Sequence, residues 1–331
     1  MITCTLTIDY EIYGNGEGSL KDLVYEPAER LMAAFGKRTR RFVPFVEVAE
    51  LEMIESSRTD PAIELVKQQI RKLYKEGFEL GLHLHPQWYN GRYANGKWLL
   101  DYGEYNLCTL PRERIVQIVD RSMAYLRNIL DEPNFTPLSF RAGNWLLQPT
   151  GTVAGVLAER GIKVDSSLFK GGLQHGHGLD YRRAPRNAYY WKFANRVDTP
   201  DSQGYLLELP IYTNMIPTWK MFTAKRVNLQ QKGSSAVRSN KSRLYRIADL
   251  LRFHYPLKLD FCRMTINELM RMVDKVIRDD QMNPSLFRPI VAIGHTKDLI
   301  DFKTVELFLD YLDKQQIDLT TFEDVYPRCI Q

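Results

Sequence analysis

Five short polar clusters, each at or just past the end of an apolar run, constrain what this chain can fold into. They lie far apart in the sequence, so only the fold can bring them together. In a parallel α/β fold the carboxyl ends of the strands meet at one edge of the sheet, where such residues line a common pocket. The pattern therefore predicts a parallel α/β protein and makes the chain a candidate hydrolase. The clusters are Thr7 to Glu11, Gly81 to Pro86, Phe140 to Trp145, Val164 to Ser167 and Ile293 to Thr296.

Strand-like and helical segments alternate along much of the chain. Apolar residues recur at helical spacing from Pro61 to Glu76, and Gly77 then precedes a strand-like run from Phe78 to Leu84. Repeated strand-helix units predict a parallel sheet or a barrel. We find no internal repeat or low-complexity linker, so we expect a single domain over residues 1–331. Further predicted helices are 111–130, 153–160, 265–279 and 305–314, and further predicted strands are 2–8, 162–165, 206–211, 289–293 and 317–320.

The composition, with 44% hydrophobic and 26% charged residues over 331 positions, is typical of a soluble protein with a large core. No apolar run approaches the roughly 18 residues that a membrane-spanning helix needs, and no secretory leader is visible. The four cysteines are scattered and form no CxxC pair, which argues against a disulfide framework or a zinc ribbon. We therefore expect a cytoplasmic protein.

Positive charge is concentrated in one segment. Lys220 to Arg263 holds eleven lysine or arginine residues and two aspartates, a net charge of +9 in a chain whose total is +5. We interpret residues 213–263, approximately, as a basic insertion. It is either a solvated loop or a patch for an anionic partner such as a sugar nucleotide, a lipid-linked phosphate or an anionic membrane surface. Because the segment has no recognisable nucleic-acid-binding motif, we expect no nucleic-acid partner.

The first two clusters carry groups that bind metals. Asp9 and Glu11 are two residues apart, as are His83 and His85, and this spacing points both members of a pair to one face of a strand. Carboxylates together with imidazoles suit zinc, manganese or cobalt. With His295 at a separate strand end, the set predicts three protein ligands and a position open to water, as in catalytic zinc sites. Local hydrogen bonding of the histidines is the simpler alternative.

The order and context of the five clusters resemble the polysaccharide deacetylase family, also called the NodB-homology or carbohydrate esterase 4 family, from Thr7 to about Val325. The resemblance implies an irregular (β/α)7-type barrel and a metal-dependent hydrolase that removes an N-acetyl group from a sugar. Its substrate would be an N-acetylated sugar, a sugar nucleotide or a lipid-linked glycan. The similarity is greatest to deacetylases of O-antigen and capsule biosynthesis.

The resemblance also implies a role for individual residues. Asp9 would be the catalytic base and Arg141 its tether, while Asp165 would keep His295 protonated as the acid that donates to the departing amine. The turn from Gly143 to Trp145 would offer a backbone N–H to the oxyanion. The metal, zinc first and manganese or cobalt next, would be held by Glu11, His83 and His85. The expected substrate contacts are Asn144, Trp145 and Trp88. For Trp88 the alternative is packing in a hairpin around the turn signals Asn90-Gly91 and Asn95-Gly96.

The motifs depart from the family pattern in ways that leave alternatives open. Tyr10 separates Asp9 from Glu11, so the roles of the two acids could be exchanged. Only Leu84 separates the two histidines, so His83 could be a ligand or its neighbour. His175 and His177, in a glycine-rich loop, could supply a substrate contact or a rival metal site. Two other functions stay open: a metal-free amidohydrolase of a small amide or ureide, and a non-catalytic carbohydrate-binding relative.

Overall fold

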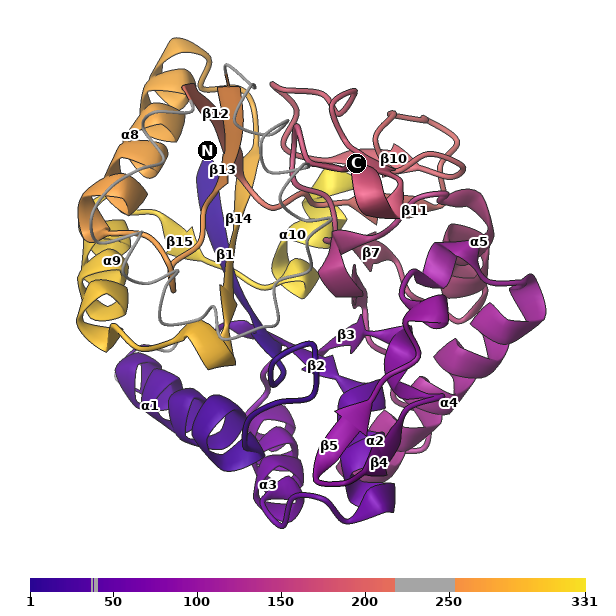
Figure 1. The fold of residues 1–331 in the computed structure, drawn as a ribbon. Helices are drawn as coiled ribbons and strands as arrows, with labels where there is room; N and C mark the ends of the chain where they lie inside the picture. Colours follow the sequence, from indigo (N-terminus) through magenta and orange to yellow (C-terminus); the bar gives the residue numbers. More distant parts are fainter. Residues whose placement is uncertain (37, 39–40, 218–253) are drawn as a thin grey trace.

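A curled, nine-stranded sheet forms the centre of the structure, a computed structural model that describes residues 1–36, 38, 41–217 and 254–331 (Figure 1). The strand order is β10-β11-β7-β6-β3-β2-β1-β14, and β15 pairs with β1. Neighbouring strands are parallel except β10, which is antiparallel to β11, so the predicted parallel sheet is confirmed. The strands are β1 (Ile2–Tyr10), β2 (Val43–Glu47), β3 (Gly81–Leu84), β6 (Ser139–Ala142), β7 (Val164–Asp165), β10 (Trp191–Phe193), β11 (Leu206–Glu208), β14 (Arg288–His295) and β15 (Asp318–Leu319).

The two ends of the curled sheet approach each other. Ile211, just after β11, forms a single parallel bridge with Val291 of β14, and Asp260 bridges Ile293 of the same strand. These bridges nearly close the sheet into the predicted barrel type. The carboxyl ends of β1, β3, β6, β7 and β14, which carry the five polar clusters, therefore face one another.

Two apolar clusters occupy the two faces of the sheet. The larger includes Ile8 and Tyr10 of β1 together with the outer helices. In the smaller, Phe322 of helix α10 (Phe322–Cys329) packs edge-on against Phe45 of β2. The N–H of Glu323 donates to Glu79, just before β3, which places α10 near the amino ends of the strands and leaves their carboxyl ends for the polar clusters.

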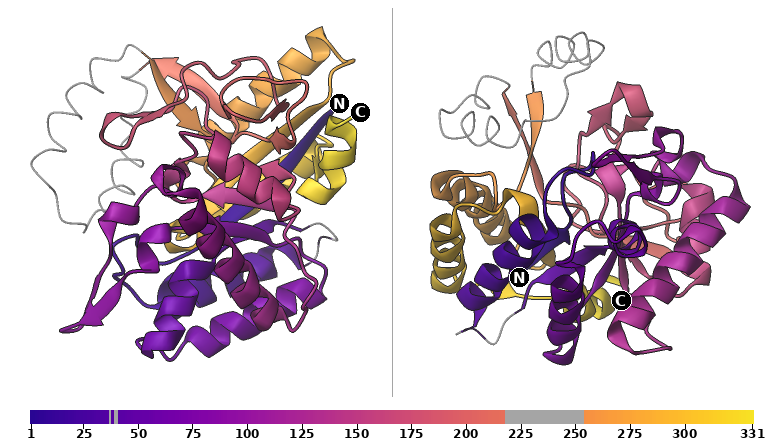
Figure 2. Two further views of the ribbon diagram at one scale, coloured as in Figure 1. Left: turned by 90° about the vertical axis from the view of Figure 1, so that its right-hand side faces the viewer. Right: turned by 60° about the horizontal axis from the view of Figure 1, so that its bottom comes forward.

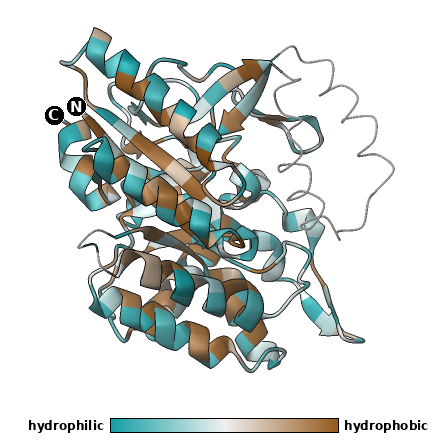
Figure 3. Ribbon diagram, turned by 90° about the vertical axis from the view of Figure 1, so that its left-hand side faces the viewer, coloured by the Kyte–Doolittle hydropathy of each residue, from teal (hydrophilic) through white to brown (hydrophobic). Residues whose placement is uncertain are grey.

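Helices surround the outer face of the sheet, and α8 and α9 lie beside β1 and β14 (Figure 1). Each of these helices carries both hydrophilic and hydrophobic residues, as expected of amphipathic helices that pack on a sheet (Figure 3). Helix α8 begins with a capping box, in which Thr265 and Glu268 bond each other's backbone N–H. The other bounds are α1 (Glu26–Phe35), α2 (Val48–Ser57), α3 (Ile63–Lys75), α4 (Arg112–Leu130), α5 (Gly151–Glu159), α8 (Ile266–Met282) and α9 (Phe302–Lys314).

In the described residues, three short hairpins extend from this body. Asn95 and Gly96, both with positive φ, form the predicted turn between β4 (Arg92–Ala94) and β5 (Lys97–Leu99). The other pairs are β8 (Leu173–Gln174) with β9 (Leu179–Asp180), and β12 (Thr213–Pro217) with β13 (His254–Lys258). The β12–β13 hairpin projects from the sheet (Figure 2) and is the stem of the predicted basic insertion, most of which lies outside the described residues. In the described part of the chain, no helix is both long and apolar enough to cross a membrane.

Candidate active site

Strand β1 sorts its side chains between the two faces of the sheet. Ile8 and Tyr10 point into the outer core, whereas Thr7 and Asp9 point to the other face, where both contact Arg141. Asp9 is paired in register with His295 of β14, so residues from opposite ends of the chain become neighbours. Asp9 and Glu11 share a face, as their spacing predicts.

Arg141 on β6 is fully buried and is held by several acceptors. Its Nη1 lies 2.6 Å from Oδ1 of Asp9, its Nη2 donates to Thr7, and its Nε donates to the carbonyl of Ser166. The guanidinium also stacks over Phe45, 4.1 Å from the ring centroid. Burial alone would raise the pKa of Asp9, but Arg141, with His83 and His295, outweighs burial and lowers it. Asp9 is therefore a fixed, ionised carboxylate.

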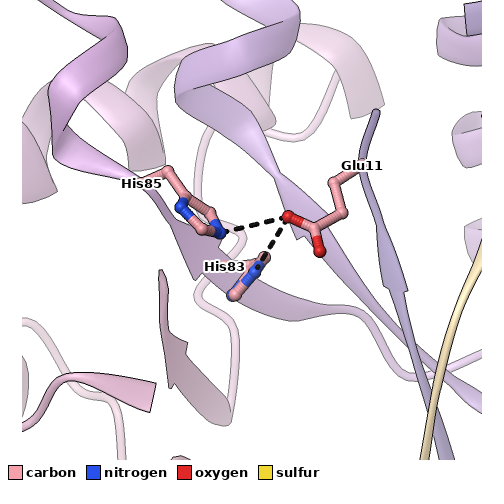
Figure 4. A group of neighbouring side chains, drawn as sticks. All are labelled: Glu11, His83 and His85. Carbon is pink, nitrogen blue, oxygen red and sulfur yellow. Dashed lines mark ion pairs between the residues drawn. The ribbon is translucent and has the colours of Figure 1, made fainter. Parts of the chain in front are cut away.

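Glu11, His83 and His85 converge on one point (Figure 4). Oε2 of Glu11 lies 3.1 Å from Nε2 of His85 and 3.6 Å from Nε2 of His83. Burial would raise the pKa of Glu11, but Lys297 and the two histidines lower it well below its usual range. Two donors on one tetrahedral zinc ion are about 3.4 Å apart, given ligand bonds near 2.1 Å. The three residues therefore fit a metal site.

Outer contacts prepare both histidines for a metal. Nδ1 of His83 lies 2.8 Å from the carbonyl oxygen of Arg141, which accepts its proton and leaves Nε2 free to bind a cation. Nδ1 of His85 lies near the side-chain amides of Gln87 and Asn144, at 3.2 and 3.3 Å. The buried Oε1 of Gln87 has no hydrogen-bond partner in the described part of the chain, and rotation of that amide would let it accept from His85. The contact with Arg141 therefore favours Nε2 of His83 as its metal-binding atom, and a rotated Gln87 amide would do the same for His85.

Lys297 also belongs to the site, although the sequence analysis did not select it. Its Nζ lies 2.8 Å from Oε1 of Glu11 and donates to the carbonyl of Ile12. Burial would lower the pKa of Lys297, but Glu11 outweighs burial and raises it, so the lysine stays charged. Its position two residues after His295 was the one sequence feature that could have marked Lys297 as a site residue. The partner, 286 positions away, is apparent only from the pairing of β1 with β14.

His295 lies beside both acids of the first cluster. Its Nε2 is 3.5 Å from Oδ2 of Asp9 and 3.8 Å from Oε1 of Glu11, and its Nδ1 is 3.6 Å from Oδ2 of Asp298. The ring is buried, and burial lowers the pKa of His295 despite the nearby carboxylates. In the described chain, its ion-pair partners do not include Asp165. The predicted pairing of Asp165 with His295 is therefore absent from this structure, and Asp298 occupies that place.

Asp165 instead belongs to a buried network behind Arg141. It accepts hydrogen bonds from the N–H and hydroxyl of Ser167, and it shares a hydrogen bond with the carboxyl of Glu208. Burial raises the pKa values of both Asp165 and Glu208. β7 is register-paired with β6 and β11 and thereby holds Asp165 between Phe140 and Glu208. Its position supports the geometry of β6 and Arg141.

The predicted substrate contacts separate into two groups. Trp88 is completely buried and packs edge-on against Trp98, so it cannot contact a sugar, and that prediction is wrong. Asn144 and Trp145 are partly buried at the end of β6, and the Trp145 ring lies edge-on to His295. Both have positive φ, at 54° and 60°. For a tryptophan this backbone conformation is strained, which is common at functional sites.

A glycine allows this turn to approach the metal-site histidine. A Cβ on Gly143 would lie 2.6 Å from the carbonyl oxygen of Leu84 and 2.7 Å from Cγ of His85, too close for any other residue. In the glycine-rich loop, His177 packs its ring against Tyr105, with centroids 4.6 Å apart. In the described chain, the groups that could hold a metal are Glu11 with His83 and His85, and Asp9 with Glu11 and His295. Neither group includes His175 or His177.

No family model matches this sequence, and no curated protein matches it. Solved structures do match in fold. A protein of Mycobacterium smegmatis named as a polysaccharide deacetylase aligns with 99% of this chain and 90% of its own length, at a TM-score of 0.56 and 13% identity. The chain has a polysaccharide deacetylase fold. A 4-alpha-glucanotransferase from Thermococcus litoralis also aligns with 99% of this chain, but over 38% of its own length, at a TM-score of 0.52 and 13% identity.

These matches confirm the predicted fold class, a NodB-homology type of α/β half-barrel with a curled parallel sheet. The two aligned proteins carry different names, and identity to each is 13%. One fold can support unrelated reactions, so the reaction has to be argued from the side chains of the site.

Proposed function

We propose that this protein hydrolyses the amide bond of an N-acetylated sugar with the help of a divalent metal. The observation that carries the proposal is the position of Asp9. It is held by Arg141, lies 3.5 Å from His295, and is next to the cluster of Glu11, His83 and His85. A fixed base, a proton donor and a ligand set at one edge of a sheet are the parts that amide hydrolysis needs.

Glu11, His83 and His85 would hold the metal, and their mixed oxygen and nitrogen donors suit zinc first, with manganese or cobalt next. When bound, the metal supplies Lewis-acid polarisation of the amide carbonyl and makes water a stronger acid. Glu11 lies 3.6 Å from His83 and 3.1 Å from His85. Asp9 lies 3.8 Å from His83 but is bound by Arg141 at 2.6 Å, which favours Glu11 as the ligand and Asp9 as the base.

Asp9 and His295 would move the proton. Asp9, ionised because Arg141 lowers its pKa, accepts a proton as water attacks the acetamide. Nε2 of His295 lies 3.5 Å from Oδ2 of Asp9, so this proton is one step from a ring that can pass it to the departing amine. A backbone N–H in the turn from Gly143 to Trp145 remains our candidate for the oxyanion.

The partly buried Trp145, beside His295, is the proposed sugar contact. We extend the proposal to glycans of the cell surface, such as O-antigen or capsule, which the protein would process as sugar nucleotides or lipid-linked intermediates. The pattern of Asp9, Glu11 and His83 to Gln87, which resembles deacetylases of those pathways, supports this choice.

The test is acetate release from N-acetylated sugar nucleotides and lipid-linked glycans, with and without a chelator. We expect wild-type activity to be lost on chelation and restored by zinc, and Asp9→Asn to abolish it. Activity that survives Asp9→Asn would show that Asp9 is not the base, and no release from any acetylated glycan would count against the deacetylase proposal.

One observation favours the metal-free amidohydrolase as a second candidate. Lys297 already neutralises Glu11 through a contact of 2.8 Å. A site with this internal counter-charge can hold Glu11 ionised without a cation. Full activity in the presence of the chelator, on a small amide or ureide, would support this candidate.

A further inference from the structure

Lys258, the last residue of β13, lies beside the site, and no described residue pairs with it as an acid. Its Nζ is 3.2 Å from the ring centroid of Trp145 and 4.7 Å from that of Phe169. Within residues 1–36, 38, 41–217 and 254–331, no carboxylate oxygen lies within 4.0 Å of this ammonium, although the side chain is partly buried. Trp145 in turn contacts His295, so Lys258 is one side chain away from the proposed proton donor.

The other cations of this edge are matched by acids. Each has a carboxylate oxygen within 3 Å, and each of those carboxylates belongs to a different residue of the site. The pairs are Arg141 with Asp9 at 2.6 Å, Lys297 with Glu11 at 2.8 Å, and Arg263 with Asp298 at 2.6 Å.

The acid nearest to Lys258 in sequence is engaged elsewhere. Oδ1 of Asp260 accepts the backbone N–H groups of Cys262 and Arg263, at 3.0 and 3.1 Å. Among the described residues, Lys258 is therefore a surplus positive charge of the site.

An unpaired ammonium that is removed from water is unfavourable, and contact with aromatic faces recovers only part of the loss. Burial, with Arg263 and Arg141 nearby, lowers the pKa of Lys258 to about 7 although Asp260 and Asp9 oppose the shift. An anion placed against Lys258 would supply the missing counter-charge and favour the protonated amine. The described residues thus leave room for a further negative charge beside Lys258.

We propose that Lys258 binds an anionic group of the substrate, a carboxylate or phosphate attached to the N-acetylated sugar. This inference rests on the proposed function, because it assumes that the sugar lies against Trp145. It narrows the substrate class to acidic sugars, either uronate-containing glycans or sugars linked to a phosphate. Lys258 is then a specificity residue that recognises the substrate and takes no part in the proton transfers.

Binding is measured by titration calorimetry on the full-length protein in chelator, so that turnover does not interfere. The probes are neutral triacetylchitotriose, a hyaluronan tetrasaccharide that carries carboxylates, and UDP-N-acetylglucosamine, which carries a diphosphate. We expect the wild type to bind one anionic probe at least about tenfold more tightly than the neutral one, the effect of one charge-assisted hydrogen bond. The probe that binds identifies the carboxylate or the phosphate as the source.

Variants then assign the preference to Lys258. Lys258→Met should remove the roughly tenfold preference and leave affinity for the neutral probe within about twofold, while Lys258→Arg should retain it. Lys163→Met is the matched control, because that exposed lysine also lies over an aromatic ring, Tyr326, at 5.8 Å. Equal loss of affinity for neutral and anionic probes would overturn the proposal.

Two further measurements cover the case in which Lys258→Met does not fold and separate this proposal from the deacetylase proposal. If Lys258→Met does not fold, the wild type alone decides, since equal affinity for all three probes contradicts the inference. Acetate release is followed separately with the same probes plus metal. Selective anion binding without acetate release would support the recognition role of Lys258 and count against the deacetylase proposal. Acetate release with equal efficiency from neutral and anionic probes would support the deacetylase proposal and count against the recognition role.

Discussion

Asp298 places its Oδ2 3.6 Å from Nδ1 of His295, while Arg263 holds the same carboxylate through Nη2 at 2.6 Å. Among the described residues the buried Nδ1 of His295 has no hydrogen-bond partner, so a small approach of Asp298 would fix the tautomer that leaves Nε2 facing Asp9. We expect Asp298→Asn to lower kcat for acetate release by about 10²-fold with little change in KM, as for loss of a group that orients a general acid. Asp298→Glu should restore part of the rate.

Asp165→Asn is the comparison for Asp298→Asn. Asp165 contacts Ser167 and Glu208, so its loss should act mainly on stability, measured as the free energy of unfolding in urea. If Asp165→Asn stays as stable as the wild type but loses activity with an unchanged KM, Asp165 and not Asp298 would be the residue that controls His295.

The metal site predicts one ion per chain. Glu11→Gln should weaken zinc binding by more than about 100-fold, and Gln87→Leu, which removes an outer contact of His85, by about tenfold. The exposed Gln68→Leu is the matched control and should bind zinc normally. Competition with a chelating dye measures the affinities. Zinc binding that is unchanged in Glu11→Gln would place the ion elsewhere.

The two tryptophans should respond in opposite ways to substitution. Trp88→Ala removes a fully buried side chain, so we expect a loss of about 3–5 kcal/mol in the free energy of unfolding. Trp145→Ala should leave stability nearly unchanged but raise KM for the sugar, because this ring lies partly exposed beside His295. Urea unfolding and steady-state kinetics separate the two effects. A raised KM in a stably folded Trp88→Ala would contradict the buried, structural role.

Much of the fold could be predicted from local patterns. Helices α3, α4 and α8 have strong helical periodicity, and the Thr265 to Glu268 capping box marks the start of α8. The unit of β2 and α2, residues 43–57, was not predicted. Its strand is only five residues long and contains Pro44, which normally argues against a central strand. The charged residues Glu47 and Glu50 are buried, so the sequence does not look like that of a core segment.

The candidate site was predictable only as far as strand ends and spacing allow. Asp9, Glu11, His83, His85, Arg141 and His295 meet because parallel strands bring their carboxyl ends together. The contacts of Lys297 and Lys258 depend on the β1–β14 register and on a hairpin stem, which no spacing reveals. Aromatic residues such as Trp88 and Trp145 look alike in the sequence, because burial is decided by tertiary packing.

Glu79 should make stability depend on pH. It is buried beside α10, where it accepts from the N–H of Glu323 and the hydroxyl of Ser139. Burial raises the pKa of Glu79 from 4.5 to about 7, so the folded chain keeps a proton that the unfolded chain has lost. Its stabilising contribution is therefore complete below about pH 4.5 and disappears as the pH rises through about 7, a change of at most about 3 kcal/mol. Glu79→Gln should flatten this decline in urea unfolding at pH 5 and pH 8, and exposed Glu76→Gln should not. Parallel declines in the wild type and Glu79→Gln would show that another group titrates.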